Sequence, residues 1–135
     1  ELNPDAAGAY RALGFIAMNT DDPPSALKAL SSALELDPQD IDARVQFGLL
    51  QCHVEECGLG ISNLELAARQ DPMNPGTFLA IARAKGEAGL LKAANAAFDR
   101  AAILDPHHPN LNLVRGYLAG LNNNGSESDE SDDDR

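Results

Sequence analysis

Large apolar residues and small residues alternate along the chain, and Asp-Pro pairs divide this pattern into segments. A residue before proline is disfavoured in the α region, so Asp37-Pro38, Asp71-Pro72 and Asp105-Pro106 should each end a helix. Pro75 and Pro109 suit the first position of a helix, where a missing N–H costs nothing, and Asp22 suits an N-cap. The pattern predicts helices at 7–19, 23–36, 41–54, 57–70, 75–88, 91–104 and 109–121.

Three of the four Asp-Pro pairs, at 37–38, 71–72 and 105–106, recur at a fixed interval of 34 residues. Counting back from the prolines gives three units, with a fourth that begins at Pro109. The units are 7–40, 41–74 and 75–108. A period of this length is typical of repeated helical hairpins that stack on one another.

The three units agree at six register positions. Positions 8, 20 and 27 hold small residues, which let paired helices approach closely: Gly14, Ala26, Ala33, Gly48, Gly60, Ala67, Ala82, Ala94 and Ala101. Positions 4, 7 and 24 hold mostly large residues, which should fill the space around the helices: Tyr10, Leu13, Leu30, Arg44, Phe47, Leu64, Phe78, Ile81 and Phe98.

These residues resemble the tetratricopeptide repeat, a helix–turn–helix unit of 34 residues. The resemblance covers residues 7 to 121 and implies an all-α fold: an α-solenoid of three repeats in a domain over 1–121, with a capping helix at 109–121. Arg44 replaces an aromatic residue at position 4, and Ala17, Gln51 and Lys85 replace a tyrosine at position 11. The last helix should cover the apolar end of the third repeat.

The resemblance also implies a concave groove lined by the first helix of each repeat. The expected partner-binding residues are Arg11, Phe15, Met18, Val45, Leu49, Cys52, Leu79, Arg83, Leu113 and Tyr117. Most of them are apolar, so the expected ligand is a peptide or protein segment with hydrophobic anchors. The alternative is that some of these side chains belong to the core between helices, with a narrower groove.

Some tetratricopeptide domains hold the C-terminal carboxylate of heat-shock chaperones with basic and amide side chains at five positions. This chain places Arg11, Phe15, Gln46, Gly76 and Ala80 at those positions, and only the first carries a charge. Carboxylate recognition of this kind is therefore not expected.

Cys52, His53 and Cys57 lie close together in the sequence. Their spacing does not match the common zinc motifs, which supply four ligands in tetrahedral array. The preferred interpretation is two buried structural thiols, with a metal or redox site and a local disulfide as alternatives. The two histidines at 107 and 108 are expected to be exposed turn residues, and no metal or cofactor is predicted.

The chain carries a net charge of −11, and part of the excess lies at the C-terminus. An acidic surface repels phosphate backbones and anionic membranes, so neither partner is expected. Residues 122–135 are predicted to form a disordered acidic tail. This tail would aid solubility, bind a basic partner, accept phosphate at Ser126, Ser128 or Ser131, or fold back onto Arg11 and Arg83.

The composition excludes several other classes. Aromatic residues make up only 4% of the chain, which disfavours a β-sandwich or barrel, and its apolar runs are too short to cross a membrane. A trimmed leader before Glu1 is an open possibility. The sequence contains no phosphate-binding glycine loop, nucleophile elbow or metalloprotease motif, so no enzymatic activity is expected.

Two functions remain. The first is a cytoplasmic interaction module of the adaptor or co-chaperone type. The second follows from a weaker similarity to the class II type III secretion chaperones, which implies binding of a hydrophobic segment of a translocator. That similarity rests on residues 9–15, 43–52, 75–80 and 89–91. The sequence predicts no oligomeric state.

Overall fold

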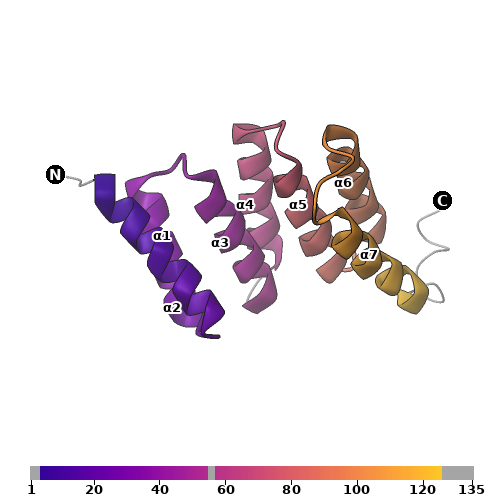
Figure 1. The fold of residues 1–135 in the computed structure, drawn as a ribbon. Helices are drawn as coiled ribbons and strands as arrows, with labels where there is room; N and C mark the ends of the chain where they lie inside the picture. Colours follow the sequence, from indigo (N-terminus) through magenta and orange to yellow (C-terminus); the bar gives the residue numbers. More distant parts are fainter. Residues whose placement is uncertain (1–3, 55–56, 126–135) are drawn as a thin grey trace. The chain divides into compact units, whose positions relative to one another are not determined.

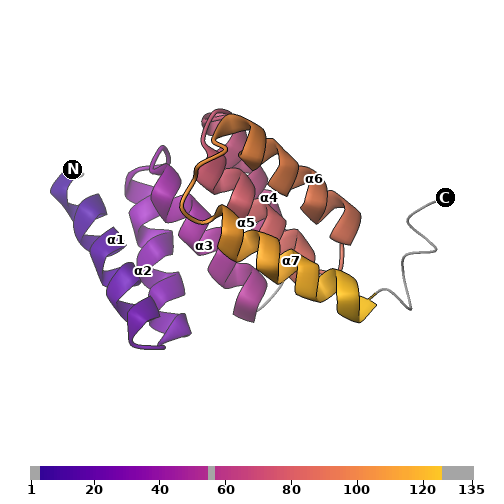
Figure 2. The ribbon, with the colours of Figure 1, turned by 45° about the vertical axis from the view of Figure 1, so that its right-hand side comes forward.

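The computed structural model describes residues 4–54 and 57–125. These residues form seven α-helices joined by short turns, and no strand occurs among them (Figures 1 and 2). The helices are α1 (Pro4–Asn19), α2 (Pro23–Leu36), α3 (Ile41–Val54), α4 (Cys57–Gln70), α5 (Pro75–Glu87), α6 (Leu91–Leu104) and α7 (Leu111–Gly125). The all-α fold and the seven helices predicted from the sequence are confirmed.

The chain divides into two compact units between Pro72 and Met73. Unit 1 contains the hairpins α1–α2 and α3–α4, and unit 2 contains the hairpin α5–α6 together with α7. Within unit 1, α2 also packs against α3, which joins the two hairpins. Within unit 2, α7 packs against both α5 and α6.

The helix ends follow from local side-chain chemistry. The Asp22 carboxylate accepts a hydrogen bond from the Ser25 backbone N–H at 3.3 Å, which confirms the predicted N-cap of α2. The Asn74 side chain caps α5 in the same way. At the end of α5, Gly89 adopts a φ of 84°, and the Leu90 N–H donates to the Lys85 carbonyl at 2.8 Å. This left-handed position is one that glycine occupies without strain.

The core of unit 1 consists of small and large apolar residues, and Ala26, Leu30, Ala33 and Phe47 among them lie at the predicted positions. The buried cluster contains Ala17, Ala26, Leu30, Ala33, Ala43 and Leu50, with Phe15, Met18, Leu27, Leu34 and Phe47 packed against it. Leu30 and Ala26 are fully buried, as are Leu64 and Ala67 of the second hairpin. Side chains of three different helices therefore meet in one core.

A polar network takes the place of the missing aromatic residue in the second repeat. Arg44 donates to the Asn63 side-chain oxygen at 3.2 Å and to the Pro38 carbonyl at 2.9 Å. Asn63 in turn donates to Gln51 at 2.7 Å, and Gln70 donates to the Pro38 carbonyl at 3.1 Å. The arginine thus ties α3 to α4 and to the preceding turn by hydrogen bonds rather than by ring packing.

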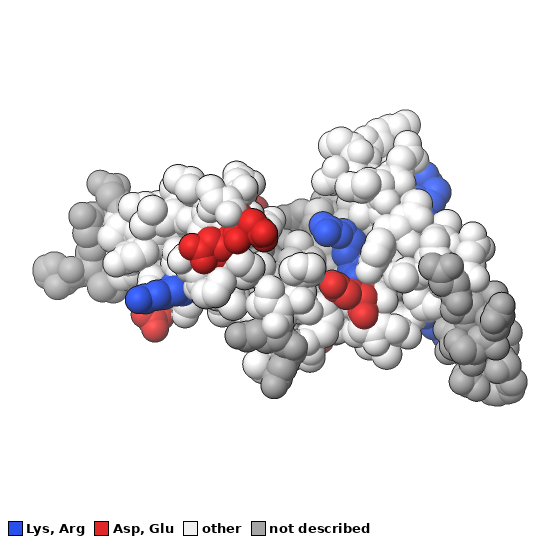
Figure 3. Space-filling view, turned by 90° about the horizontal axis from the view of Figure 1, so that it is seen from below, with Lys and Arg blue, Asp and Glu red and all other residues white. Residues whose placement is uncertain are grey.

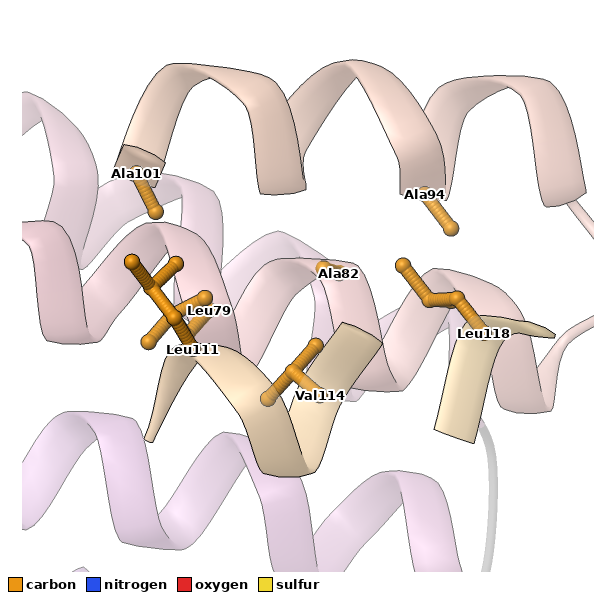
Figure 4. Close-up of a cluster of buried hydrophobic side chains, with 7 residues drawn as sticks. All are labelled: Leu79, Ala82, Ala94, Ala101, Leu111, Val114 and Leu118. Atoms are coloured by element: carbon orange, nitrogen blue, oxygen red, sulfur yellow. The ribbon is translucent and has the colours of Figure 1, made fainter. Parts of the chain in front are cut away.

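In unit 2, α7 covers the hairpin α5–α6, as predicted for a capping helix. Its Leu111, Val114 and Leu118 are buried against the first two helices of the unit (Figure 4). Arg115 of α7 lies over the Phe98 ring, 5.3 Å from the ring centre, and adds a cation–π contact to α6. Without α7, the apolar faces of α5 and α6 that it covers would meet water.

Two sequence predictions need correction. Tyr10 and Leu13, expected to fill space between helices, are instead exposed on α1. In α3 the equivalent of Leu13 is Phe47, which packs beside residues of α2. None of the described helices covers this face of α1, so the side chains there stay in solvent.

The second correction concerns the end of the chain. α7 begins at Leu111, and Pro109 lies in the preceding turn instead of at the first helical position as predicted. The helix runs to Gly125, four residues beyond the predicted end at 121, so residues 122–125 are helical. The remainder of the predicted acidic tail, residues 126–135, lies outside the described residues. Among the described residues, no helix combines the length and apolar character needed to cross a membrane.

Candidate functional site

In unit 1, the predicted apolar ligand residues of α1 and α3 are half-buried. Phe15 and Met18 pack against the core cluster of the unit and keep part of their surface in solvent. Val45 and Leu49 lie one helical turn apart on α3 and are also partly exposed. All four residues remain available for contact, although the first two also contribute to the core.

Arg11 has a structural partner. Its guanidinium lies 3.3 Å from the Asp40 carboxylate and 4.0 Å from that of Asp42. Asp40 also accepts a hydrogen bond from the Ala43 backbone N–H at 3.1 Å, which caps the start of α3. Arg11 therefore joins α1 to the N-terminus of α3. The sequence analysis missed Asp40, although an aspartate directly before a predicted helix is the signal of such a cap.

Cys52 does not belong to a ligand-facing surface. Its side chain is buried, and a disulfide joins it to Cys57 at the start of α4. The interpretation of these residues as separate buried thiols is therefore wrong. The bond links the end of one helix to the start of the next.

Leu79 is part of the core of unit 2. Only 3% of its surface is exposed, and it packs with Leu111 and Val114 of α7 and with Ala101 of α6 (Figure 4). Its expected role as a ligand anchor is corrected, in line with the alternative that some predicted positions belong to the core. The physical reason is that α7 covers this face of α5.

Arg83, Leu113 and Tyr117 form the exposed part of the predicted site in unit 2. Leu113 and Tyr117 lie one turn apart on α7 and are 68% and 37% exposed. A Cβ atom on Gly86 of α5 would lie 3.1 Å from a carbon of the Tyr117 ring, so this glycine lets the ring approach α5. We call Arg83, Glu87, Leu113 and Tyr117 the α5–α7 surface.

The pKa of the Tyr117 hydroxyl is affected by two opposite charges of α5. Burial raises the pKa of Tyr117 above 10.0, the nearby Glu87 carboxylate raises it further, and the Arg83 guanidinium lowers it. Tyr117, with Leu113 one turn away on α7, is thus subject to the charges of a cation and an anion of α5. This combination can hold an apolar side chain of a ligand and orient its backbone or polar groups.

Charged side chains are sparse on the face drawn in Figure 3. Lys, Arg, Asp and Glu occupy small, separate areas there, and most of the surface carries other residue types. Within the described ranges 4–54 and 57–125, His, Cys, Asp and Glu do not gather in threes that could hold a metal ion.

No family model matches the chain, and no curated protein matches it. Several solved structures match the chain. The Arabidopsis OM64 TPR domain superposes with a TM-score of 0.77 at 16% identity, over 87% of this chain and 97% of that one. The chain has the tetratricopeptide-repeat fold.

Two further tetratricopeptide-repeat structures contain peptides. The first TPR of Spaghetti (RPAP3), bound to the HSP90 peptide SRMEEVD, has a TM-score of 0.78 at 12% identity and covers 93% of this chain and 97% of its own. The Yersinia enterocolitica type III secretion chaperone SycD, in complex with a peptide of the translocator YopD, has a TM-score of 0.74 at 18% identity. The match covers 87% of this chain and 89% of the SycD chain. Identities this low establish the shared fold only.

In the tetratricopeptide-repeat register, α1, α3, α5 and α7 are the leading helices of successive repeats. The site residues that keep exposed surface lie on these four helices, and none lies on α2, α4 or α6. Each unit therefore presents its own part of the predicted ligand-binding set.

Proposed function

We propose that the chain is a protein-interaction module of the adaptor or co-chaperone type, which binds a segment of another polypeptide through apolar anchors. The observation that carries this proposal is the α5–α7 surface. Leu113 is 68% exposed and lies one turn from Tyr117, whose pKa is affected by the charges of Glu87 and Arg83. An exposed leucine costs solvation free energy, and a ligand that covers it together with the ring recovers that free energy.

Unit 1 supports the same function with a second apolar surface. Val45 and Leu49 on α3, and Phe15 and Met18 on α1, each keep part of their side chains in solvent. A ligand with several large apolar residues would cover such surfaces better than a single anchor. Binding in the micromolar range is expected, because small interfaces offset little more than the entropy cost of association.

The charged groups argue against a ligand held by its C-terminal carboxylate. Arg11 is engaged by Asp40 and Asp42 within the chain. Ala80 is buried, and Phe15, Gly76 and Ala80 bring no charge to a carboxylate. We therefore expect the peptide SRMEEVD, found with the Spaghetti (RPAP3) domain, to bind this chain weakly if at all.

A second candidate function is that of a type III secretion translocator chaperone. SycD, described with a translocator peptide, shares the fold over most of both chains. The mostly apolar character of Phe15, Val45, Leu49 and Tyr117 fits a hydrophobic translocator segment. A non-enzymatic, cytoplasmic role accords with both candidates, and the acidic residues beyond Gly125 would favour a basic partner.

Selection from a random peptide library on the immobilised chain tests the proposal. Selected peptides should carry two or more large apolar residues, and Leu113→Glu combined with Tyr117→Ser should weaken their binding at least about tenfold. Leu90→Glu combined with Ile103→Glu is the control, because both residues are exposed and lie outside the α5–α7 surface. Failure to select any peptide, or equal binding by both double variants, would contradict the proposal.

Addition of a translocator's hydrophobic segment separates the two candidates. A chaperone of this class should keep that segment soluble and form a stable complex with it. If the chain binds selected peptides but leaves the translocator segment to precipitate, the adaptor function stands and the chaperone function is excluded.

A further inference from the structure

An apolar strip runs along the exposed side of α1. Tyr10, Leu13 and Ile16 are 40%, 54% and 58% exposed and lie three residues apart, so they follow one side of the helix. A contiguous row of three exposed large apolar side chains marks a candidate interaction surface, whereas scattered single ones do not. We call these three residues the α1 strip.

The equivalent face of α3, in the second repeat, shows which kind of neighbour packs there. Leu13 occupies the same register position as Phe47, and Phe47 packs against the unit 1 core that includes Leu30 and Ala33 of α2. This position in α3 therefore meets the helix of a preceding hairpin. The α1 strip has the same register, and among the described residues nothing covers it.

The most exposed residues of α1 carry no charge, although the chain has a net charge of −11. The one charged residue of α1 between 8 and 19 is Arg11, whose guanidinium is paired with Asp40 and Asp42. From residue 8 to residue 19, its exposed residues are Gly8, Ala9, Tyr10, Ala12, Leu13, Ile16 and Asn19. Copies with a large negative charge repel one another, and this repulsion is weakest where an uncharged face meets an uncharged face. The α1 face is thus a place where two like-charged chains can approach.

The spacing of the strip also suits a two-fold axis. Tyr10 and Ile16 each lie three residues from Leu13. In an antiparallel pair of α1 helices, Leu13 would therefore meet its own copy, and Tyr10 would meet Ile16 of the second chain. Ala9 and Ala12 flank the strip and would let the two helices come within the usual packing distance of about 8–10 Å.

We propose that the α1 strip binds a second copy of this chain, in an antiparallel and self-complementary helix pair. In such an isologous interface, residue i of one copy contacts residue j of the other, and residue j of the first copy contacts residue i of the second. One pair of short helices buries less than the roughly 1,200 Å² of a standard stable interface, so the dimer should be weak and concentration-dependent. The strip excludes Phe15 and Met18, so dimerisation leaves the proposed ligand residues free.

Sedimentation velocity of the chain over a range of concentrations tests the dimer. We expect the weight-average mass to rise from monomer toward dimer as the concentration approaches about 1 mM, within the range of weak association. Leu13→Glu combined with Ile16→Glu should weaken the association at least about tenfold. Leu90→Glu combined with Ile103→Glu adds the same charge at other exposed positions and should leave it intact.

Cross-linking gives a second readout that does not depend on acidic substitutions. Leu13→Cys should form a disulfide-linked dimer under mild oxidation, since Leu13 lies on the proposed axis. Asn19→Cys, on the same exposed face but away from the axis, should cross-link much more slowly. The proposal is overturned if the chain stays monomeric at every concentration, which would leave the strip to a different polypeptide. Association that persists in the Leu13→Glu, Ile16→Glu variant would overturn it as well.

Discussion

Gly48 of α3 and Gly60 of α4 face each other across the second hairpin, with backbone against backbone. A Cβ atom on Gly48 would lie 2.8 Å from the Gly60 carbonyl oxygen and 2.9 Å from the Leu64 side chain. Real Cβ atoms do not approach a carbonyl oxygen that closely. The hairpin therefore depends on two glycines at the small positions of the repeat.

Gly60→Ala should destabilise the chain by about 2–4 kcal/mol, because a methyl group must push the two backbones apart. Gly8→Ala is the matched control, since a Cβ there meets nothing within 4 Å. In the middle of a helix that change should stabilise by about 0.5–1 kcal/mol. Urea unfolding of both variants checks the prediction, and a neutral Gly60→Ala would refute the close contact.

Leu79 is a core residue and Leu113 is a surface residue, so their substitutions should differ in effect. Leu79→Ala should cost about 2–5 kcal/mol, because it leaves a cavity among α5, α6 and α7. Leu113→Ala should change stability by about 0.5 kcal/mol or less, because the side chain is mostly exposed. Chemical denaturation of the two variants measures both effects. If Leu79→Ala leaves stability unchanged, Leu79 is not a core residue.

The Arg11–Asp40 ion pair should couple α1 to α3. Asp40→Ala should cost about 1–2 kcal/mol, because it removes both the pair and the cap of α3, whereas Arg11→Met should cost about 1 kcal/mol or less. Asp40→Asn keeps a capping oxygen and should recover part of the loss. A double-mutant cycle at low and high salt measures the coupling, which salt should reduce. A coupling of zero at low salt would contradict the prediction.

Tyr117 should make stability fall at high pH. Burial, aided by Glu87 and opposed by Arg83, raises its pKa above 10.0, so the native state holds this proton more tightly than the unfolded state. Its contribution is complete below pH 10.0 and is lost as the pH rises through the native pKa. Above pH 10.0, Tyr117→Phe should therefore lose stability less steeply than the parent chain. If the stability of the two proteins falls with the same slope above pH 10.0, the pKa shift of Tyr117 is absent.

The sequence predicted the helices well because each boundary has a local cause. The Asp-Pro pairs and the Asp22 cap act over a few neighbouring positions, and most helix ends follow them. Three helix ends were predicted less well: α1 begins at Pro4 and not at residue 7, and α7 begins at Leu111 and not at Pro109, and ends beyond 121. Asn122 and Asn123 carry no strong stop signal, and the helix continues to Gly125.

The site was harder to predict because it depends on which helices cover each other. Leu79 and Leu113 share one register position, yet α7 buries the first and leaves the second exposed. Arg11 looked like a ligand-binding cation, but Asp40, which is 29 residues away, engages it. Register alone therefore identified the candidate residues, and tertiary packing decided which of them stay accessible.

Two-dimensional NMR of the chain, titrated with a library-selected peptide, tests the central claim most directly. The largest shifts should fall on amides of Arg83, Glu87, Leu113 and Tyr117, with smaller shifts at Val45 and Leu49. Amides around Leu90 and Ile103 should stay unchanged. Shifts concentrated at Leu90 and Ile103, or absent from the α5–α7 surface, would contradict the account.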